Sequence, residues 1–181
     1  CGNPKSISYA DAVDSIQAAF EKWATILPQR FRYTIQESEA LIRMAFVDPK
    51  HDFGYSDEEF EEDSIAHASL QYPYYVHFNN RINYTIDDPE GINLFAVAAH
   101  EIGHLLQVPH TWNQDSVMNV YYPQNIRYDF NFTSHEIEAI RLAYSAHNQT
   151  VVPVTLEDAK DDTVCSRVFS YIAKIYEQVY G

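Results

Sequence analysis

The sequence has few cysteines, few basic residues and no long apolar run. Its only cysteines are Cys1 and Cys165, which excludes a zinc ribbon and a scaffold held by several disulfides. No apolar run is long enough to span a membrane. The 12 Lys and Arg face 26 Asp and Glu, and the formal net charge of −14 argues against nucleic acid or an anionic membrane as a partner. The acidity fits bound cations better, although it also fits simple solubility.

The 181 residues fit one domain with a real core and a short appendage. We divide the chain into an N-terminal segment at 1–9, a main domain at 10–147 and a C-terminal extension at 148–181, where the composition shifts. No signal peptide precedes Cys1, so we expect a mature or truncated form. Three N-x-[ST] sequons indicate glycosylation and a secreted eukaryotic chain, at Asn83, Asn131 and Asn148.

The most informative stretch reads H-E-x-x-H with a third His six residues further on. Its ionisable residues are His100, Glu101, His104 and His110. The apolar positions before and within it share one helical face and predict a buried helix: Leu94, Val97, Ala98 and Ile102. On a helix the first two histidines lie one turn apart, so their imidazoles point the same way.

Three imidazoles at this spacing predict a zinc site. Neutral imidazole suits Zn²⁺, and a catalytic zinc takes three protein ligands and leaves one position for water. Glu101 lies beside the histidines, where it can accept a proton from that water. The alternative is a surface helix with solvated side chains. The buried character of the helix argues against this alternative, because buried polar groups need partners.

Helical periodicity predicts three further helices. The first covers 11–27 and ends at Pro28, and the second covers 134–145, with Thr133 as N-cap and Glu136 completing a capping box. The third is a tail helix that docks on the main domain or binds a partner. Its apolar stripe is Val164, Val168, Ile172 and Ile175.

Short apolar segments predict strands, and polar segments predict loops. Strands are expected at 31–35, 41–47, 64–69 and 74–78. Residues 48–63 are rich in acids and aromatics and are expected to be irregular, and 112–128 is expected to be a loop.

Several motifs together resemble one known family, the matrixin branch of the metzincin metallopeptidases. The residues from Asn93 to His104 follow the family's zinc-helix wording almost throughout. Ser116-Val117-Met118 resembles the Met-turn, in which the Met118 side chain lies beneath the metal. The other matching segments are Ile65-Ala66-His67-Ala68, His77-Phe78 and the helix at 137–144.

The resemblance implies an α+β fold and a secreted endopeptidase. The fold would be a twisted, mostly parallel five-stranded sheet with one antiparallel edge strand, two long helices and, here, an extra C-terminal helix. The activity would be zinc-dependent hydrolysis of peptide bonds in extracellular proteins by a monomer, with protein or peptide substrates and proteinaceous inhibitors as partners. Glu101 would assist the attack of water at the zinc.

The resemblance also implies a second, structural zinc. Its three His positions are matched by His51, His67 and His77. The family's Asp position holds Phe53, so Asp52 is the nearest substitute and Asp57 the alternative. The acids at 57–63 either bind Ca²⁺ or form a solvated charged run, since this loop lacks the glycines with which the family wraps calcium.

Substrate-contacting residues follow from the same resemblance. An extended substrate would add a strand along 65–69, beside Ala66 and Ala68. The small Ala96 would leave a deep pocket for a large apolar side chain after the cut, with Tyr121 and Tyr122 as walls.

Two departures from the family pattern stand out. Gln107 replaces the Gly at which the chain leaves the zinc helix, and a left-handed backbone there costs a non-Gly residue about 1–2 kcal/mol. Cys1-Gly2-x-Pro4 resembles the cysteine switch of the zymogen, with Lys5 in place of its Asp. A Cys1–Cys165 disulfide is the alternative for this cysteine, and the one we favour.

Two other interpretations stay open. The Met-turn also resembles that of the astacins, another metzincin branch, although Val120 stands where astacins have a ligand Tyr. A catalytically weakened zinc module used for inhibition or binding is the other, and the intact Glu101 argues against it.

Overall fold

The structure is a computed structural model that describes most of the main domain. The described residues are 4, 6–27, 31–33, 40–52, 57–61, 63–70, 74–144 and 168–172. Within them, no helix has the length and apolar character needed to cross a membrane. Helices pack on one sheet in an α+β arrangement, as predicted.

Helix α1 (Tyr9–Trp23) follows the predicted apolar stripe. Ser8 is its N-cap and accepts a hydrogen bond from the Asp11 amide at 3.1 Å. The buried apolar residues are Ala12, Ile16, Ala19, Phe20 and Trp23. The helix ends four residues before the predicted end at 27, because the next turn tightens to i→i+3 hydrogen bonds and the Thr25 hydroxyl donates to a helix carbonyl at 2.7 Å.

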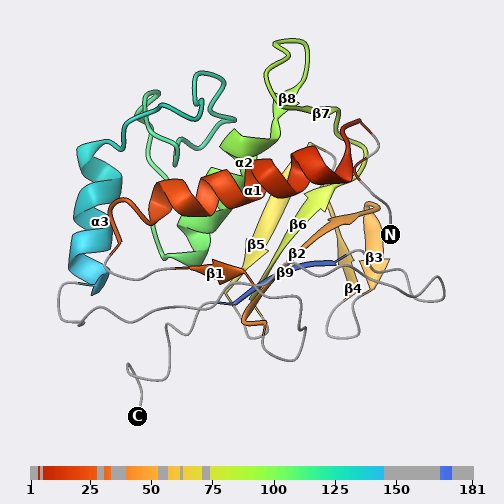
Figure 1. Cartoon of the computed structure of the whole chain (residues 1–181), viewed down its shortest axis with the longest axis horizontal. Helices are drawn as coiled ribbons and strands as arrows, with labels where there is room; N and C mark the ends of the chain where they lie inside the picture. The colour runs from red at the N-terminus through yellow and green to blue at the C-terminus, as the bar shows by residue number, and fades with distance from the viewer. Residues whose placement is uncertain are drawn as a thin grey trace.

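Helix α2 (Leu94–Leu105) carries the H-E-x-x-H motif and is largely buried. The Asn93 side chain caps it by accepting a hydrogen bond from the Ala96 amide at 3.1 Å. Helix α1 crosses over α2 (Figure 1), and the indole N–H of Trp23 donates to the Ala99 carbonyl at 2.7 Å. Because this bond joins the two helices in the core, α1 fixes the position of the motif-bearing helix.

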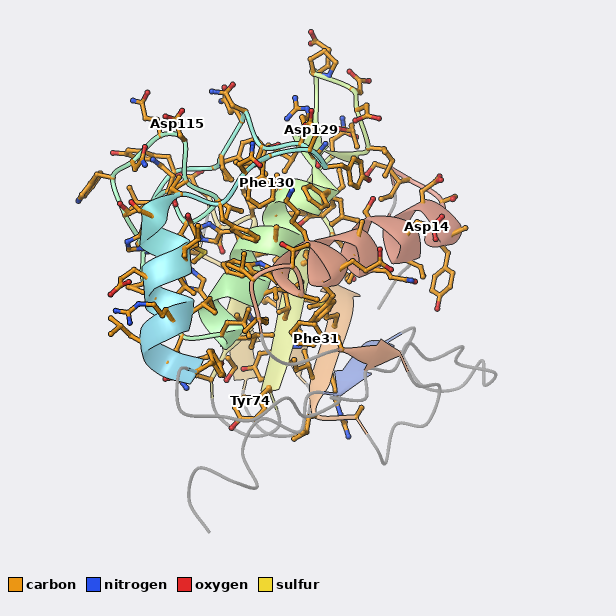
Figure 2. The ribbon with its side chains drawn as sticks, turned by 60° about the vertical axis from the view of Figure 1, so that its left-hand side comes forward. Asp14, Phe31, Tyr74, Asp115, Asp129 and Phe130 are labelled. Carbon is orange, nitrogen blue, oxygen red and sulfur yellow. The ribbon has the colours of Figure 1, made fainter. Side chains whose placement is uncertain are left out.

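Helix α3 (Ser134–Tyr144) begins with the predicted capping box. Glu136 accepts hydrogen bonds from the Thr133 amide at 2.7 Å and from the Thr133 hydroxyl at 2.5 Å. The helix buries Glu136, Ile140 and Tyr144. A long loop leads from α2 to α3. Figure 2 shows its Phe130 among the side chains between α1 and α2, where the ring lies 4.9 Å from that of Phe132.

The five-stranded sheet has the order β1-β9-β2-β6-β5. Its strands are β1 (Arg32–Tyr33), β2 (Ile42–Val47), β5 (Ala66–Ser69), β6 (Tyr74–Asn79) and β9 (Val168–Ile172). Strands β2 and β6 pair in parallel, and β5 pairs with β6 antiparallel at the end of the sheet, as the resemblance predicts. Helix α2 packs against β5 and β6, so the motif lies next to the edge strand.

The prediction of a C-terminal helix is wrong for residues 168–172, which form strand β9. This strand pairs antiparallel with both β1 and β2, so two of the five strands oppose the other three, and not the edge strand alone. The segment reads Val-Phe-Ser-Tyr-Ile, which is rich in β-branched and aromatic residues. Pairing within the sheet outweighs the helical spacing of Val168 and Ile172.

The prediction of an irregular segment at 48–63 is also wrong in part. Strands β3 (Lys50–Asp52) and β4 (Asp57–Glu59) form an antiparallel hairpin there. Charged residues fit this position because the hairpin is a separate two-stranded sheet rather than part of the central one. A second small sheet joins β7 (Tyr84–Thr85) and β8 (Ile92–Asn93) just before α2.

Candidate metal centre and cleft

The structure brings the three predicted imidazoles to one point. His100 and His104 project from α2, and His110 returns to them from the following turn. Their Nε2 atoms lie 3.1 Å apart for His100 and His110, 3.1 Å for His100 and His104, and 3.0 Å for His104 and His110.

This triangle of nitrogens fits Zn²⁺. Zinc–nitrogen bonds of about 2.0–2.1 Å in a tetrahedron require ligand nitrogens roughly 3.3–3.4 Å apart, close to the separations found here. The Nδ1 of His100 donates to the Val117 carbonyl at 2.7 Å. The Nε2 of His100 is therefore unprotonated, and its lone pair is directed at the other two rings. Converging lone pairs repel one another, and a cation between them removes the repulsion.

Burial keeps two of these imidazoles neutral. Desolvation, followed by the neighbouring His104, lowers the pKa of His100 to about 4. Desolvation, followed by the neighbouring His110, lowers the pKa of His104 to about 4. Both rings are therefore in the metal-binding form at neutral pH without any metal.

The turn that carries His110 has the left-handed backbone that the sequence suggested. Gln107 has φ 64° and is the only described non-Gly residue with a positive φ. The Val108 amide donates to the Gly103 carbonyl at 2.9 Å, which closes the end of α2. Nε2 of His135, from the first turn of α3, donates to the Pro109 carbonyl at 2.8 Å and so supports the residue next to His110.

The Met-turn lies against α2 below the histidines. A Cβ on Gly103 would overlap the sulfur of Met118 and come within 2.9 Å of the Trp23 ring, so only glycine fits there. The Met118 amide donates to the Ser116 hydroxyl at 2.9 Å, and this hydroxyl in turn donates to the buried carboxylate of Glu136. The capping residue of α3 thus also holds the Met-turn.

Glu101 lies beside the triad in a low-polarity environment. Its side chain is only 7% exposed, and desolvation raises its pKa to about 8. It nevertheless lines the cavity next to His100. A buried carboxyl group whose pKa lies near neutrality suits proton transfer.

A cavity of about 310 Å³ opens next to the triad. It is lined by Asp63, Ile65, Ala66, Val97, His100, Glu101, Asn119, Val120, Tyr121, Tyr122 and Pro123. Of the predicted substrate-contacting residues, Ala66, Tyr121 and Tyr122 therefore line it. Ala96 is fully buried in the core and is not part of the lining, whereas Val97, one position later on α2, faces the cavity. Ala68 lies further along the edge strand β5.

The residues predicted for a structural zinc are brought together in part. His67 Nε2 lies 3.2 Å from His77 Nδ1, on paired positions of β5 and β6. His51 and Asp52 are in β3, and their side chains lie outside the described part of the structure, as does that of Asp57.

The predicted glycosylation sites and cysteines lie partly inside and partly outside the described residues. Asn83 and Asn131 are exposed, as glycosylation requires. Cys1, Cys165 and Asn148 lie outside the described residues.

Sequence reasoning missed most of the residues that support the site. Ser116 and His135 were not assigned a supporting role, and Glu136 was predicted only as a helix cap. The capping box was the one sequence signal for Glu136. Its contact with Ser116 joins residues 20 positions apart, and no local pattern predicts such a contact.

An edge strand beside a helix with a convergent His triad, above a Met-turn, defines the metzincin class of fold. The Matrixin family profile matches residues 2–145, and the chain belongs to this family. The match favours the matrixin branch over the astacin-like interpretation.

Individual relatives agree with the family match. The chain is 34% identical over 161 residues to stromelysin-2 of Rattus norvegicus and 30% identical over 155 residues to matrix metalloproteinase-26 of Homo sapiens. It is 31% identical over 138 residues to the hatching enzyme of Paracentrotus lividus. These alignments cover 84%, 83% and 76% of this chain but only 33%, 58% and 23% of the relatives, so the chain spans a part of their length.

Proposed function

We propose that the chain is a secreted, zinc-dependent endopeptidase that cleaves peptide bonds in extracellular proteins. The observation that carries this proposal is the meeting of three Nε2 atoms within 3.1 Å of one another beside a cavity that Glu101 also lines. Membership of the matrixin family supports it, because the relatives named above include two stromelysin-type or matrix metalloproteinases.

His100, His104 and His110 would hold the zinc. When bound there, zinc supplies a Lewis acid that polarises the scissile carbonyl and acidifies water. Glu101 accepts a proton from the water and delivers it to the leaving amine. A cation held by the neighbouring imidazoles favours the ionised form of Glu101, which lowers its pKa from about 8 and prepares it as a base.

The substrate lies extended along β5 and adds a strand to the sheet. Within the described part of the chain, β5 pairs with β6 and ends the strand order, which supports strand addition at this end of the sheet. The side chain that follows the cut enters the cavity, where Ile65, Val97 and Val120 offer apolar surface. A volume of about 310 Å³ suits a large apolar side chain.

Further components of the family pattern belong to this proposal. His67 and His77, with His51 and Asp52, hold a structural zinc, and the 3.2 Å separation of His67 Nε2 from His77 Nδ1 supports it. The acids at 57–63 bind Ca²⁺. Asn83, Asn131 and Asn148 are glycosylated, and Cys1 pairs with Cys165 or acts as a latency switch. The protein is a monomer that meets proteinaceous inhibitors outside the cell.

The decisive experiment combines cleavage of a quenched peptide library with zinc counting by mass spectrometry. Parent protein should cleave, should lose activity to a chelator and should regain it with zinc. Glu101→Gln should keep the zinc and lose at least about 100-fold in kcat. Glu138→Gln is the control, because this exposed carboxylate only pairs with Arg141 and should leave turnover unchanged. A Glu101→Gln protein that cleaves at the parent rate would refute the proposed role of Glu101.

A further inference from the structure

A buried tyrosine reaches from β7 to the start of the edge strand. The Tyr84 hydroxyl donates at 2.7 Å to the carbonyl of Ile65, the residue that directly precedes β5, and Tyr84 is only 1% exposed. Its ring packs edge-on against those of Phe46 and Phe78, at centroid distances of 5.5 Å and 6.1 Å. Because the core holds the ring, the hydroxyl meets the edge strand at a fixed point.

This hydroxyl keeps its proton. Burial, and after it the charge of Glu101, raises the pKa of Tyr84 well above its usual range, although the Asn79 amide acts in the opposite direction. Tyr84 is therefore a hydrogen-bond donor throughout the neutral pH range. The influence of Glu101 also places the phenol near the carboxyl group that lines the cavity.

The residue that Tyr84 holds decides which way the next backbone groups point. The Asn79 amide donates to the Ile65 carbonyl at 3.0 Å, so this carbonyl faces β6. In an antiparallel pair, such residues alternate with residues whose N–H and C=O point away from the partner strand. Ala66 is the next residue and lies opposite Phe78, so its backbone groups face away from β6. The Ser64 hydroxyl donates to the Ala66 carbonyl at 3.3 Å, and a carbonyl oxygen accepts two hydrogen bonds.

The position of Ile65 matters for the metal centre. Ile65 and Ala66 both line the cavity that Glu101 also lines. A shift of Ile65 would therefore move the outward backbone groups of Ala66 relative to Glu101. Strand addition relies on backbone hydrogen bonds, so such a shift weakens peptide binding without touching the histidine triad.

We propose that Tyr84 is a positioning residue, whose hydroxyl holds Ile65 so that the backbone of Ala66 meets an extended peptide in register with the metal centre. Tyr84 acts through Ile65 and does not contact the peptide itself, because its side chain is enclosed by the core. This inference rests on the proposed peptidase function. It concerns the alignment of the peptide backbone and not a preference for any substrate side chain.

The test removes the hydroxyl and keeps the ring. Tyr84→Phe should fold, because the Ile65 carbonyl retains its bond from the Asn79 amide. It should raise the KM for a quenched peptide about fivefold and change kcat less than about twofold, which is the size expected for one hydrogen bond. Tyr128→Phe is the matched control, because it also removes a hydroxyl contact, at 3.1 Å to Ser15 of α1, and should leave KM unchanged. Zinc counting should give the parent value for both variants.

A backbone-modified substrate separates alignment from general stability. The same peptide is made as a series in which one backbone nitrogen at a time is methylated and can no longer donate to the Ala66 carbonyl. In the parent and in Tyr128→Phe, one methylation of the series should raise KM by on the order of tenfold. In Tyr84→Phe the same methylation should raise KM by about twofold or less. A purely structural role would lower stability and leave the methylation penalty intact. An unchanged penalty, or a loss of zinc in Tyr84→Phe, overturns the positioning role.

A binding measurement separates failure of this role from failure of the proposed function. Calorimetric titration of the unmethylated peptide should give a dissociation constant about fivefold higher for Glu101→Gln with Tyr84→Phe than for Glu101→Gln alone. Cleavage by the parent together with equal dissociation constants overturns the role of Tyr84 alone. Unequal dissociation constants without cleavage by the parent overturn the peptidase function and keep Tyr84 as a positioning residue of a peptide-binding edge. The absence of both cleavage and binding overturns both proposals.

Discussion

Gln107 adopts a backbone conformation that is unfavourable for any residue with a side chain. Its φ of 64° places it in the left-handed region, where a Cβ crowds the following carbonyl. Gln107→Gly should therefore raise the free energy of unfolding of the zinc-free chain by about 1 kcal/mol. Denaturant titration measures this change.

Gln17→Gly within α1 is the matched control and should lower the free energy of unfolding by about 1 kcal/mol, since glycine weakens a helix interior. A loss of stability in Gln107→Gly would show that side-chain contacts outweigh the backbone strain.

Single residues also mark the limit of sequence reasoning. The substitution of Gly by Gln at position 107 could be interpreted from the sequence, because the next three residues must bring His110 back to α2. The choice between Ala96 and Val97 as the cavity residue could not. Neighbouring helix positions differ by about 100° in direction, so Val97 lines the cavity while Ala96 beside it is buried in the core.

At the scale of elements, the start of α3 and the Met-turn depend on one carboxylate. Glu136 is fully buried and accepts hydrogen bonds from Thr133 and from the Ser116 hydroxyl. Ser116→Ala should lower the free energy of unfolding by about 1–3 kcal/mol, because it removes one donor from a buried charge and the acceptor of the Met118 amide. It should also weaken zinc binding, since the Met-turn supports the triad. Ser134→Ala, at an exposed position one residue into α3, is the control for helix start effects in the same denaturant and zinc titrations. Equal effects of the two substitutions would remove the special role of Ser116.

Elements were predictable where one periodicity was unambiguous. The stripes of α1 and the apolar face of α2 could only be helical, and the alternation in 41–47 continued into the parallel pairing of β2 with β6. In 164–175 the apolar residues fit a helix and a strand equally, and the pairing of β9 between β1 and β2 decided the outcome. The hairpin of β3 and β4 was hidden because its residues are mostly charged.

For the whole molecule, the predictable part of the site is the part that is local in sequence. The histidine triad spans 11 positions and follows from helix geometry and one turn, as the Nε2 separations of 3.0–3.1 Å illustrate. The cavity draws its lining from three separate segments at 63–66, 97–101 and 119–123. Only the resemblance to matrixins placed these segments together beforehand, and it could not specify Asp63 or Asn119.

The buried charges of the centre predict how the stability of the zinc-free chain depends on pH. The pKa of His100 and His104 falls from 6.5 in the unfolded chain to about 4 in the folded one, so the unfolded state binds more protons between these values. This contribution to stability is present above pH 6.5 and is lost as the pH falls to 4. The pKa of Glu101 instead rises from 4.5 to about 8, so its contribution is present below pH 4.5 and is lost as the pH rises to 8.

At intermediate pH the contribution of the histidines and that of Glu101 change in opposite directions. Outside this range the two contributions can be measured separately. Of these three groups, Glu101 is the one that changes its proton binding between pH 6.5 and 8, and its contribution to the stability of the zinc-free chain should fall as the pH rises. Glu101→Gln should abolish this decline and leave the loss of stability on acidification to pH 4 unchanged, because that loss belongs to the histidines. Denaturant titrations of both proteins in chelator at half-unit pH steps measure the two slopes. If the decline above pH 6.5 persists in Glu101→Gln, another group causes it. The idea that a bound cation relieves the cost of burying the Glu101 carboxyl group would then lose its support.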